Sequence, residues 1–196
     1  MARRARGPRD VVDLATRCYL DGEPIEMSEL AQQLGIGRAT LYRWLGNRER
    51  LIETVLAEAT DRTYRRAARH ARGVGAARVL DLMRRGMRDV LAAEPLQVFT
   101  KREPLLFIRL ATMPGKIEDQ AATVIAEVIE EEITAGRLDL PVPARTVALG
   151  LVRISDALLY APLFGRSEPE VETALDLAAL LLGVADRRPE SAGSPA

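Results

Sequence analysis

The segment 35–50, GIGRATLYRWLGNRER, concentrates side chains that can bind a nucleic acid. The guanidinium of Arg38 can donate two hydrogen bonds to guanine O6 and N7, Thr40 can contact a thymine methyl group or a phosphate, and the Tyr42 hydroxyl can donate to a phosphate. Arg43 and Arg48 are placed for backbone phosphates, which position a protein on DNA without reading its sequence. The segment therefore predicts contacts with double-stranded DNA.

Two short predicted helices hold these side chains. Ser28 is a good N-cap for the first helix, which we expect to end at Gly35, and the second runs from about Arg38 to Leu45. Gly35 allows the positive φ that a helix C-terminus often needs, and Ala31 is small where the two helices must approach closely. Such a pair is the frame of a helix-turn-helix, whose second helix enters the major groove.

The candidate DNA-binding residues lie mainly on the outer face and at the start of that second helix. Trp44 is the exception, because a core position and a DNA-facing position remain equally open for the only tryptophan of the chain. Asn47 is expected to cap the next helix, whose free N–H groups would offer another phosphate site. The complete set is Ser28, Gly37, Arg38, Ala39, Thr40, Tyr42, Arg43, Trp44 and Arg48.

Apolar residues recur with helical spacing nearly throughout the chain, and no segment shows sustained two-residue alternation. We therefore predict an all-α fold of about nine helices. After the helix-turn-helix, the expected ranges are 47 to about 73, 78–93, one or two short helices within 96–113, then 117–135, 144–161 and 168–184. Ser167 and Glu170 would form a capping box for the last helix. In the helix at 117–135, Ile133 should face inward while Glu130 and Glu131 face water.

The organisation predicted from these ranges has three parts. Residues 1–60 form a helix-turn-helix DNA-binding domain, residues 61–185 form a ligand-binding and dimerisation domain, and the polar, Pro/Gly-containing stretch 186–196 is a disordered tail.

Bulk composition limits the classes of function. The chain has 28 basic and 28 acidic residues, so any affinity for DNA must come from local charge patterns. Cys18 is the single cysteine, no apolar run is long enough to span a membrane, and no apolar segment follows the basic N-terminus, so we expect a cytoplasmic protein. His70 is the only histidine, and the sequence lacks a metal-ligand cluster, a Gly-rich phosphate loop and a nucleophile elbow. We therefore predict neither an enzyme nor a bound metal or cofactor.

Two other functions remain open from the residues alone. The chain could be a helical adaptor with no DNA role, or an enzyme of small-molecule metabolism that uses only carboxylates. Ionic strength would separate DNA binding from an apolar protein contact, because only DNA binding weakens steeply through counterion release as salt rises.

The larger domain carries polar residues on an otherwise apolar helix. Arg153, Asp156 and Tyr160 lie at i, i+3 and i+7, so they either satisfy one another internally or point into a pocket and orient a ligand. Methionines and aromatic rings elsewhere would suit an adaptable apolar pocket, although each can equally be core. The candidate residues for an unknown small-molecule effector are Met83, Met87, Phe99, Phe107, Arg109, Arg153, Asp156 and Tyr160.

The last two predicted helices are apolar on more than one side, and a helix with two apolar faces needs two partners. One partner is the core of the same chain, and we expect the other to be a second copy across a two-fold axis, which forms a four-helix interface. Such a homodimer favours a palindromic operator. The candidate interface residues are Leu149, Leu158, Leu159, Ala174, Leu177, Ala178 and Leu181.

The stretch 27–52, MSELAQQLGIGRATLYRWLGNRERLI, resembles the DNA-binding domain of TetR-family transcriptional regulators. The family pattern G-V-S-x-x-T-L-Y-x-H-F-x-x-K-E-x-L is matched at Gly35, Ile36, Thr40, Leu41, Tyr42, Glu49 and Leu51. Gly37 replaces the usual Ser or Thr cap, Trp44 a common His, Leu45 a common Phe and Arg48 a common Lys.

The remainder of the chain is similar to the ligand-binding domain of the QsdR-like branch of that family, chiefly in FTKREPLLFIRLAT at 99–112 and VRISDALLYAPLFG at 152–165. The resemblance implies a TetR-like helical bundle behind the helix-turn-helix. It also implies a repressor whose affinity for DNA falls when a small molecule binds, with lactone-like signals as a ligand class by analogy.

Overall fold

The structure, a computed structural model, describes residues 7–166 and 168–184, and within these ranges it is all-α, as predicted. The helices are α1 (Pro8–Leu20), α2 (Met27–Leu34), α3 (Arg38–Leu45), α4 (Arg48–His70), α5 (Ala76–Leu91), α6 (Glu94–Arg102), α7 (Pro104–Thr112), α8 (Lys116–Thr134), α9 (Ala144–Leu159) and α10 (Val171–Leu181), with a 3-10 turn η1 (Ala161–Phe164). The stretch 96–113 contributes to two helices because the chain bends at Glu103 and Pro104 starts a new helix.

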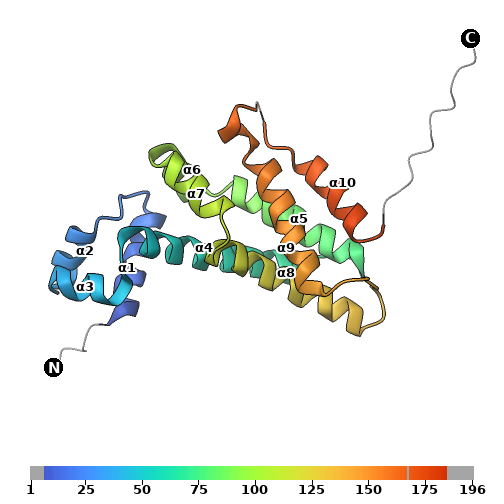
Figure 1. Cartoon of the computed structure of the whole chain (residues 1–196), viewed down its shortest axis with the longest axis horizontal. Helices are drawn as coiled ribbons and strands as arrows, with labels where there is room; N and C mark the ends of the chain where they lie inside the picture. Colours follow the sequence, from blue (N-terminus) through green and yellow to red (C-terminus); the bar gives the residue numbers. More distant parts are fainter. Residues whose placement is uncertain (1–6, 167, 185–196) are drawn as a thin grey trace, which may run out of the picture.

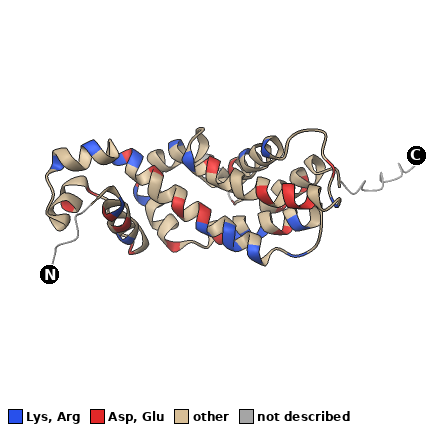
Figure 2. Ribbon diagram, turned by 90° about the horizontal axis from the view of Figure 1, so that it is seen from below, with Lys and Arg blue, Asp and Glu red and all other residues tan. Residues whose placement is uncertain are grey.

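The helices form a small N-terminal unit and a larger bundle that share α4 (Figure 1). The three helices α1 to α3 gather at one end, and α4 runs from them into the bundle, where it packs against α5 and α8. α9 packs on α8 and is covered in turn by α10. Basic and acidic residues are interspersed along the helices instead of separating into two charged faces (Figure 2).

Two hydrophobic cores correspond to these two units. The distal core joins the second half of α4 to α5, α8, α9 and α10. The N-terminal core joins α1, α2, α3 and the first half of α4, and it also includes Phe99, Phe107 and Ala111 from α6 and α7. The predicted domain boundary at residue 60 assigns α6 and α7 to the larger domain, although their side chains pack in the N-terminal core.

The turn between α2 and α3 is closed by a glycine, as the sequence predicted. Gly35 has φ +60, its N–H donates to the carbonyl of Gln32, and the N–H of Ile36 donates to the carbonyl of Ala31, both at 3.0 Å. These two hydrogen bonds satisfy carbonyl groups in the last turn of α2. Ala31 is only 3% exposed, which places it at the close approach of the two helices.

The predicted N-cap of α2 is wrong. The helix begins at Met27, and Glu26 precedes it without a side-chain cap bond, so Ser28 is an exposed residue of the first helical turn. The earlier start brings Met27 onto the same face as Leu30 and Ala31, and all three are buried.

Two details of the later helices also differ from the prediction. Ile133 is 38% exposed whereas the neighbouring Glu132 is fully buried, so the inward face at the end of α8 is shifted by one residue. Glu170 stands directly before α10 and not in its first turn. Ser167, the predicted cap, lies outside the described residues, as do residues 185–196 with the predicted tail.

Glu132 ties the loop between α4 and α5 to the C-terminal end of α8. Its carboxylate accepts hydrogen bonds from Arg137 Nε at 2.6 Å, from Arg78 Nη1 at 2.7 Å and from the backbone N–H of Gly75 at 2.7 Å. Gly75 has φ +59, and an added Cβ would stand 2.4 Å from the carbonyl oxygen of Arg137. The bonds from Arg137, then Arg78 and Gly75, hold the pKa of Glu132 well below its usual value although burial opposes this.

We expect Glu132→Gln to lower the free energy of unfolding by about 1–3 kcal/mol near pH 7, because the buried side chain at this position would lose its charge-assisted hydrogen bonds and place an amide NH₂ against guanidinium donors. The native pKa of Glu132 is below the unfolded value of 4.5, so its stabilisation is present above that pH and is lost as the pH falls. Urea unfolding at several pH values should therefore show a difference between wild type and variant that narrows in acid. Exposed Glu130→Gln is the control, and equal effects of the two substitutions would contradict the assignment.

Candidate DNA-binding surface and internal cavity

The outer face of α3 presents the side chains that the sequence assigned to DNA. Arg38, Ala39 and Arg43 are exposed, and Tyr42 is 48% exposed, while Leu41 on the opposite side is fully buried. Neither arginine has an ion-pair partner among the described residues, so both guanidinium groups are free to donate to bases or phosphates. This exposed face has the form of a recognition helix, and Leu41 on the opposite side anchors the helix in the N-terminal core.

The ends of α3 and the start of α4 complete this surface. Gly37 precedes α3 in an extended conformation without a side-chain bond, and Gly46, with φ +77, ends the helix. Asn47 caps α4 as predicted, because its Oδ1 accepts a hydrogen bond from the N–H of Arg50 at 2.9 Å. Thr40 is half-buried beside Gly37.

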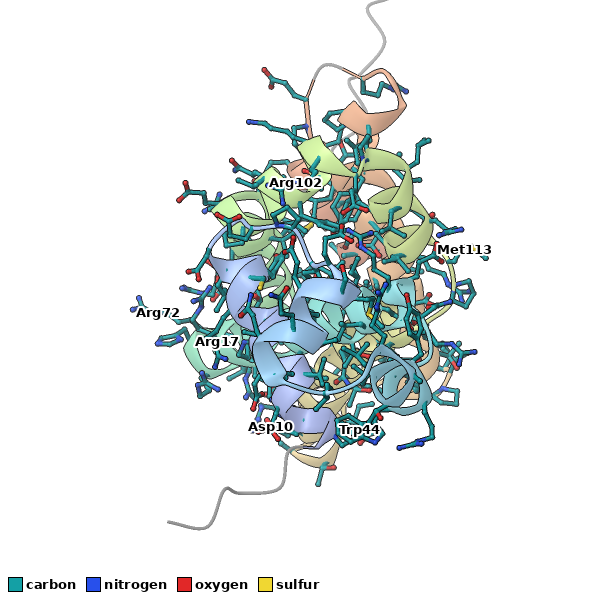
Figure 3. The ribbon with its side chains drawn as sticks, turned by 90° about the vertical axis from the view of Figure 1, so that its left-hand side faces the viewer. Asp10, Arg17, Trp44, Arg72, Arg102 and Met113 are labelled. Carbon is teal, nitrogen blue, oxygen red and sulfur yellow. The ribbon has the colours of Figure 1, made fainter. Side chains whose placement is uncertain are left out.

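Trp44 packs against the N-terminal core and keeps part of its side chain accessible. Figure 3 looks onto the helix-turn-helix end and shows Trp44 at the same lower edge as Asp10 of α1. Trp44 therefore packs on the core with one part of its ring, and the accessible part keeps the DNA-facing possibility a prediction.

The phosphate contact predicted for Arg48 is wrong. Its Nη1 and Nη2 donate to the two carboxylate oxygens of Glu103 at 2.8 and 2.6 Å, and its Nε donates to the carbonyl of Ile25 at 2.7 Å. Hydrogen bonding from Arg48 also holds the pKa of Glu103 below its usual value. A guanidinium engaged on all three nitrogens, with 27% of its side chain exposed, is not available for DNA.

Two further contacts join the corner between α6 and α7 to the N-terminal unit. Arg109 of α7 pairs with Glu49 of α4, and Arg102 of α6 donates to the carbonyl of Gly22 at 2.7 Å (Figure 3 labels Arg102). Arg109, a candidate ligand residue, thus lies in an exposed ion pair. The corner is fastened both to the loop after α1 and to the first turn of α4.

A cavity in two adjoining parts, both partly open to solvent, lies on the other side of α6 and α7. Its larger part, about 150 Å³, is bounded by α5, α6, α7, the end of α9 and η1, and its smaller part, about 50 Å³, extends toward α1 and α4. Both parts touch Val90, Leu96, Phe107 and Tyr160. The described lining is apolar apart from hydroxyl groups and the amide of Gln97, and it includes no charged side chain.

Two of the eight candidate ligand residues line this cavity and the other six lie elsewhere. The rings of Phe107 and Tyr160 meet edge to face at 4.9 Å between centroids, and both border the two parts. Phe99 packs on Phe107 within the N-terminal core. Met83 and Met87 are buried in the distal core and line neither part, so their assignment to a pocket is wrong.

Arg153 and Asp156 adopt neither predicted arrangement. Arg153 is exposed, and its Nε donates to Glu118 at 2.5 Å, so it neither pairs with Asp156 nor enters the cavity. Asp156 is half-buried and has no ion pair among the described residues. Burial, with a smaller contribution from Glu118, raises the pKa of Asp156 to about 8, so this carboxyl is mainly protonated at neutral pH. Its charge would also raise the pKa of Tyr64 and of Tyr160, which burial already raises.

The candidate dimer residues divide into two groups. Leu159, Ala174 and Ala178 are at most 3% exposed because they pack in the distal core, so they are not available to a partner. Leu149 and Leu158 are half-buried on α9, and Leu177 and Leu181 are 38% and 44% exposed on α10. Leu180, at 58%, belongs to the same apolar stripe and was not among the predicted residues, although its spacing of i+3 from Leu177 would have identified it. Val184, at 49%, is exposed just beyond the end of α10.

A helix-turn-helix with a free arginine face, attached through one long helix to a bundle that contains a cavity, defines a class of ligand-responsive transcriptional regulators. Residues 74–183 match the family model "Tetracyclin repressor-like, C-terminal domain". The chain is similar to the structure of the R. erythropolis transcriptional repressor QsdR from the TetR family, with 51% sequence identity, a TM-score of 0.89, and coverage of 91% of this chain and 95% of that chain. The chain belongs to the TetR family.

A second solved structure shares the fold. The TetR-family repressor AlkX from Dietzia sp. strain DQ12-45-1b is 21% identical, with a TM-score of 0.62 and coverage of 93% of this chain and 96% of that chain. No curated protein matches the chain. Within the described ranges, no helix is both long and apolar enough to cross a membrane.

Proposed function

We propose that the protein is a homodimeric, cytoplasmic repressor that leaves a palindromic operator when a small neutral molecule occupies the cavity lined by Phe107 and Tyr160. The observation that carries the proposal is the exposed, unpaired Arg38 and Arg43 on the outer face of α3, with Tyr42 beside them. Membership of a family of DNA-binding regulators supports a regulatory role without catalysis.

The cavity favours a neutral effector. An ion entering it would lose its hydration and meet no opposite charge in the described lining. The hydroxyl groups of Tyr19, Thr60, Thr63 and Tyr160 can donate hydrogen bonds to an oxygen acceptor, while the side chains of Gln97 and Thr100 already donate to backbone carbonyls. A compact molecule with an apolar chain and a carbonyl oxygen fits this chemistry, and lactones are one such class.

The effector would act on DNA binding through α6 and α7. These two helices border the cavity on one side and are fastened to the N-terminal unit on the other, by Arg48–Glu103 and by Arg109–Glu49. Arg48 and Glu49 form the first turn of α4, only two residues beyond the end of α3. A displacement of the α6–α7 corner is therefore transmitted to the recognition helix over a very short path.

We expect Glu103→Gln to lower the free energy of unfolding of the N-terminal unit by about 1–3 kcal/mol, because the partly buried Arg48 loses its charged acceptor. Trp44 is the only tryptophan and packs in that unit, so its fluorescence during urea unfolding reports this unit directly. Glu94→Gln, an exposed carboxyl of α6, is the control. An unfolding curve for Glu103→Gln that coincides with wild type would show that the pair does not fasten the corner.

Selection of bound fragments from random duplex DNA tests the function as a whole. We expect enrichment of one palindromic sequence, with affinity that falls steeply as salt rises. Repeating the measurement with γ-lactones of increasing chain length should identify a length that releases the operator, and filling the cavity by Ala93→Phe should remove that release while DNA binding persists. Absence of any enriched sequence would contradict the DNA-binding role, whereas enrichment without release by any neutral ligand would contradict only the effector class.

A further inference from the structure

A cleft of about 390 Å³ lies between the outer faces of α4 and α5. It is lined by Arg66 of α4 and by Asp81, Arg84, Arg85, Arg88 and Asp89 of α5, together with His70 and Ala67. It shares no lining residue with the cavity beside α6 and α7. Figure 1 shows α5 away from the end formed by α1 to α3, so the cleft is separate from the DNA-binding surface as well.

The α5 residues of the cleft repeat at i, i+3, i+4, i+7 and i+8, which places all of them on one helical face. The opposite face of α5 is buried in the distal core through Leu82, Met83 and Met87. Because of this division, Arg84, Arg85 and Arg88 lie on the cleft side of α5 without disturbing its packing. This arrangement also means that the guanidinium groups of Arg84 and Arg88, one turn apart, can reach the same bound molecule.

Positive charge exceeds negative charge in this cleft, because both aspartates are already paired. Asp81 accepts from Arg85 at 2.8 Å and from the backbone N–H of Arg72 at 2.8 Å. Asp89 accepts from Arg66 at 3.1 Å. Four arginines against two aspartates leave a surplus of two positive charges.

Arg84 and Arg88 carry this surplus positive charge. Arg84 is half-buried and has no hydrogen bond or ion pair among the described residues. Arg88 comes only within 3.8 Å of Glu172, a residue of α10 whose side chain is 73% exposed. Two guanidinium groups on one helical face that lack a close hydrogen-bonded carboxylate repel each other, and an anion bound between them would remove that repulsion.

We propose that the α4–α5 cleft binds a small, multiply charged phosphate-bearing anion, with Arg84 and Arg88 as its main ligands. Planar guanidinium groups donate paired hydrogen bonds to phosphate oxygens. The volume of the cleft lies within the range of small-molecule sites, whereas a nucleic-acid duplex would need a far more extended basic surface. Basic and acidic residues are interspersed along the helices of the described chain and form no such continuous surface (Figure 2).

Isothermal titration of the full-length protein with pyrophosphate tests the site. We expect saturable binding that weakens roughly tenfold or more in the double variant Arg84→Gln/Arg88→Gln, since both charge-assisted contacts are lost. The control variant Arg17→Gln/Arg62→Gln removes the same net charge from exposed positions outside the cleft and should bind like wild type. The exposed Arg88→Gln alone should weaken binding in part, so the test holds even if the double variant does not fold.

Separate titrations at matched ionic strength distinguish the possible sources of phosphate. Tighter binding of pyrophosphate or a nucleoside triphosphate than of inorganic phosphate would support a multiply charged ligand. Equal weakening in the cleft and control variants would overturn the proposal. So would heat that fails to saturate and persists when sodium chloride replaces sodium pyrophosphate at equal ionic strength. A duplex that competes with pyrophosphate for the cleft would overturn it too, because the cleft would then be part of a DNA-binding surface.

Discussion

Replacing Arg38 and Tyr42 together with alanine should abolish sequence-specific DNA binding while the protein stays folded and dimeric. Both side chains are exposed on α3, and Arg38 has no intramolecular partner among the described residues, so their loss removes contacts to DNA and none that hold the fold. A well-placed base contact contributes about 1–3 kcal/mol of discrimination. Loss of a base contact and a phosphate contact should lower operator affinity by roughly tenfold at least, and the selectivity over random DNA with it.

Fluorescence anisotropy with the selected operator and with a scrambled duplex measures both effects. Arg17→Ala is the matched control, since it removes an exposed arginine of α1 and leaves α3 unchanged. The two single variants add a distinction. Arg38→Ala should reduce the difference between operator and scrambled duplex, whereas Tyr42→Ala should weaken both. If the double variant keeps its preference for the operator, α3 is not the recognition helix.

The helix-turn-helix could be predicted from sequence because its determinants act within a few residues. The turn closes because the N–H of Gly35 donates to the carbonyl three residues back and the N–H of Ile36 donates to the carbonyl five residues back. Asn47 caps α4 by accepting from the N–H three residues on. Leu41 is buried because it falls on the one apolar side of a short helix. Each of these effects is visible in a local stretch of residues.

The role of Arg48 could not be predicted in this way. Its position before an apolar helix face and beside Asn47 is equally compatible with a phosphate contact, and its actual partner, Glu103, is 55 residues away. Only the packing of Phe99 and Phe107 into the N-terminal core brings that carboxylate to α4. The same packing makes the α6–α7 corner part of the DNA-binding unit.

Glu132 shows the same limit at the end of α8. It lies in a run of three glutamates, 130–132, and nothing local marks one of them for burial. Glu132 is the one that is buried, because the guanidinium groups of Arg78 and Arg137 donate hydrogen bonds that offset the cost of burying its carboxylate. Ile133 then faces water because its neighbour occupies the inward position.

The dimer face predicted on the last two helices stays a prediction, and only some of its residues are exposed. Alanine and leucine occur on two sides of α10, and composition does not say which side meets the core of the same chain. Ala174 and Ala178 are buried where α10 packs against α5 and α9. The apolar residues that stay exposed are Leu177, Leu180 and Leu181 on α10 and Val184 just beyond it. An apolar stripe of this kind at the end of a bundle is the surface on which a second copy can pack.

Leu181→Arg should therefore convert the protein to a folded monomer with weak operator binding. Leu181 is 44% exposed, and its Cδ1 lies 3.9 Å from the place where a Cβ on Gly150 of α9 would stand, so it sits where the α9 and α10 faces meet. In a two-fold interface each substitution occurs twice, which would bury two unpaired guanidinium groups near the axis. In the dimer, binding of one subunit to its half-site holds the other subunit close to the second half-site. A monomer lacks this high effective concentration, so its affinity for the operator should fall by roughly 10²–10⁴-fold.

Sedimentation velocity and operator binding together decide whether the exposed stripe of α10 forms the dimer. Leu105→Arg is the control, since it introduces the same side chain at a leucine of α7 that is 81% exposed and far more accessible than Leu181. A dimeric Leu105→Arg beside a monomeric Leu181→Arg would assign the interface to α9 and α10 and exclude a general effect of added charge. If Leu181→Arg instead sediments as a dimer and binds its operator normally, the two recognition helices must be paired through another surface, and the stripe of α10 would need a different partner.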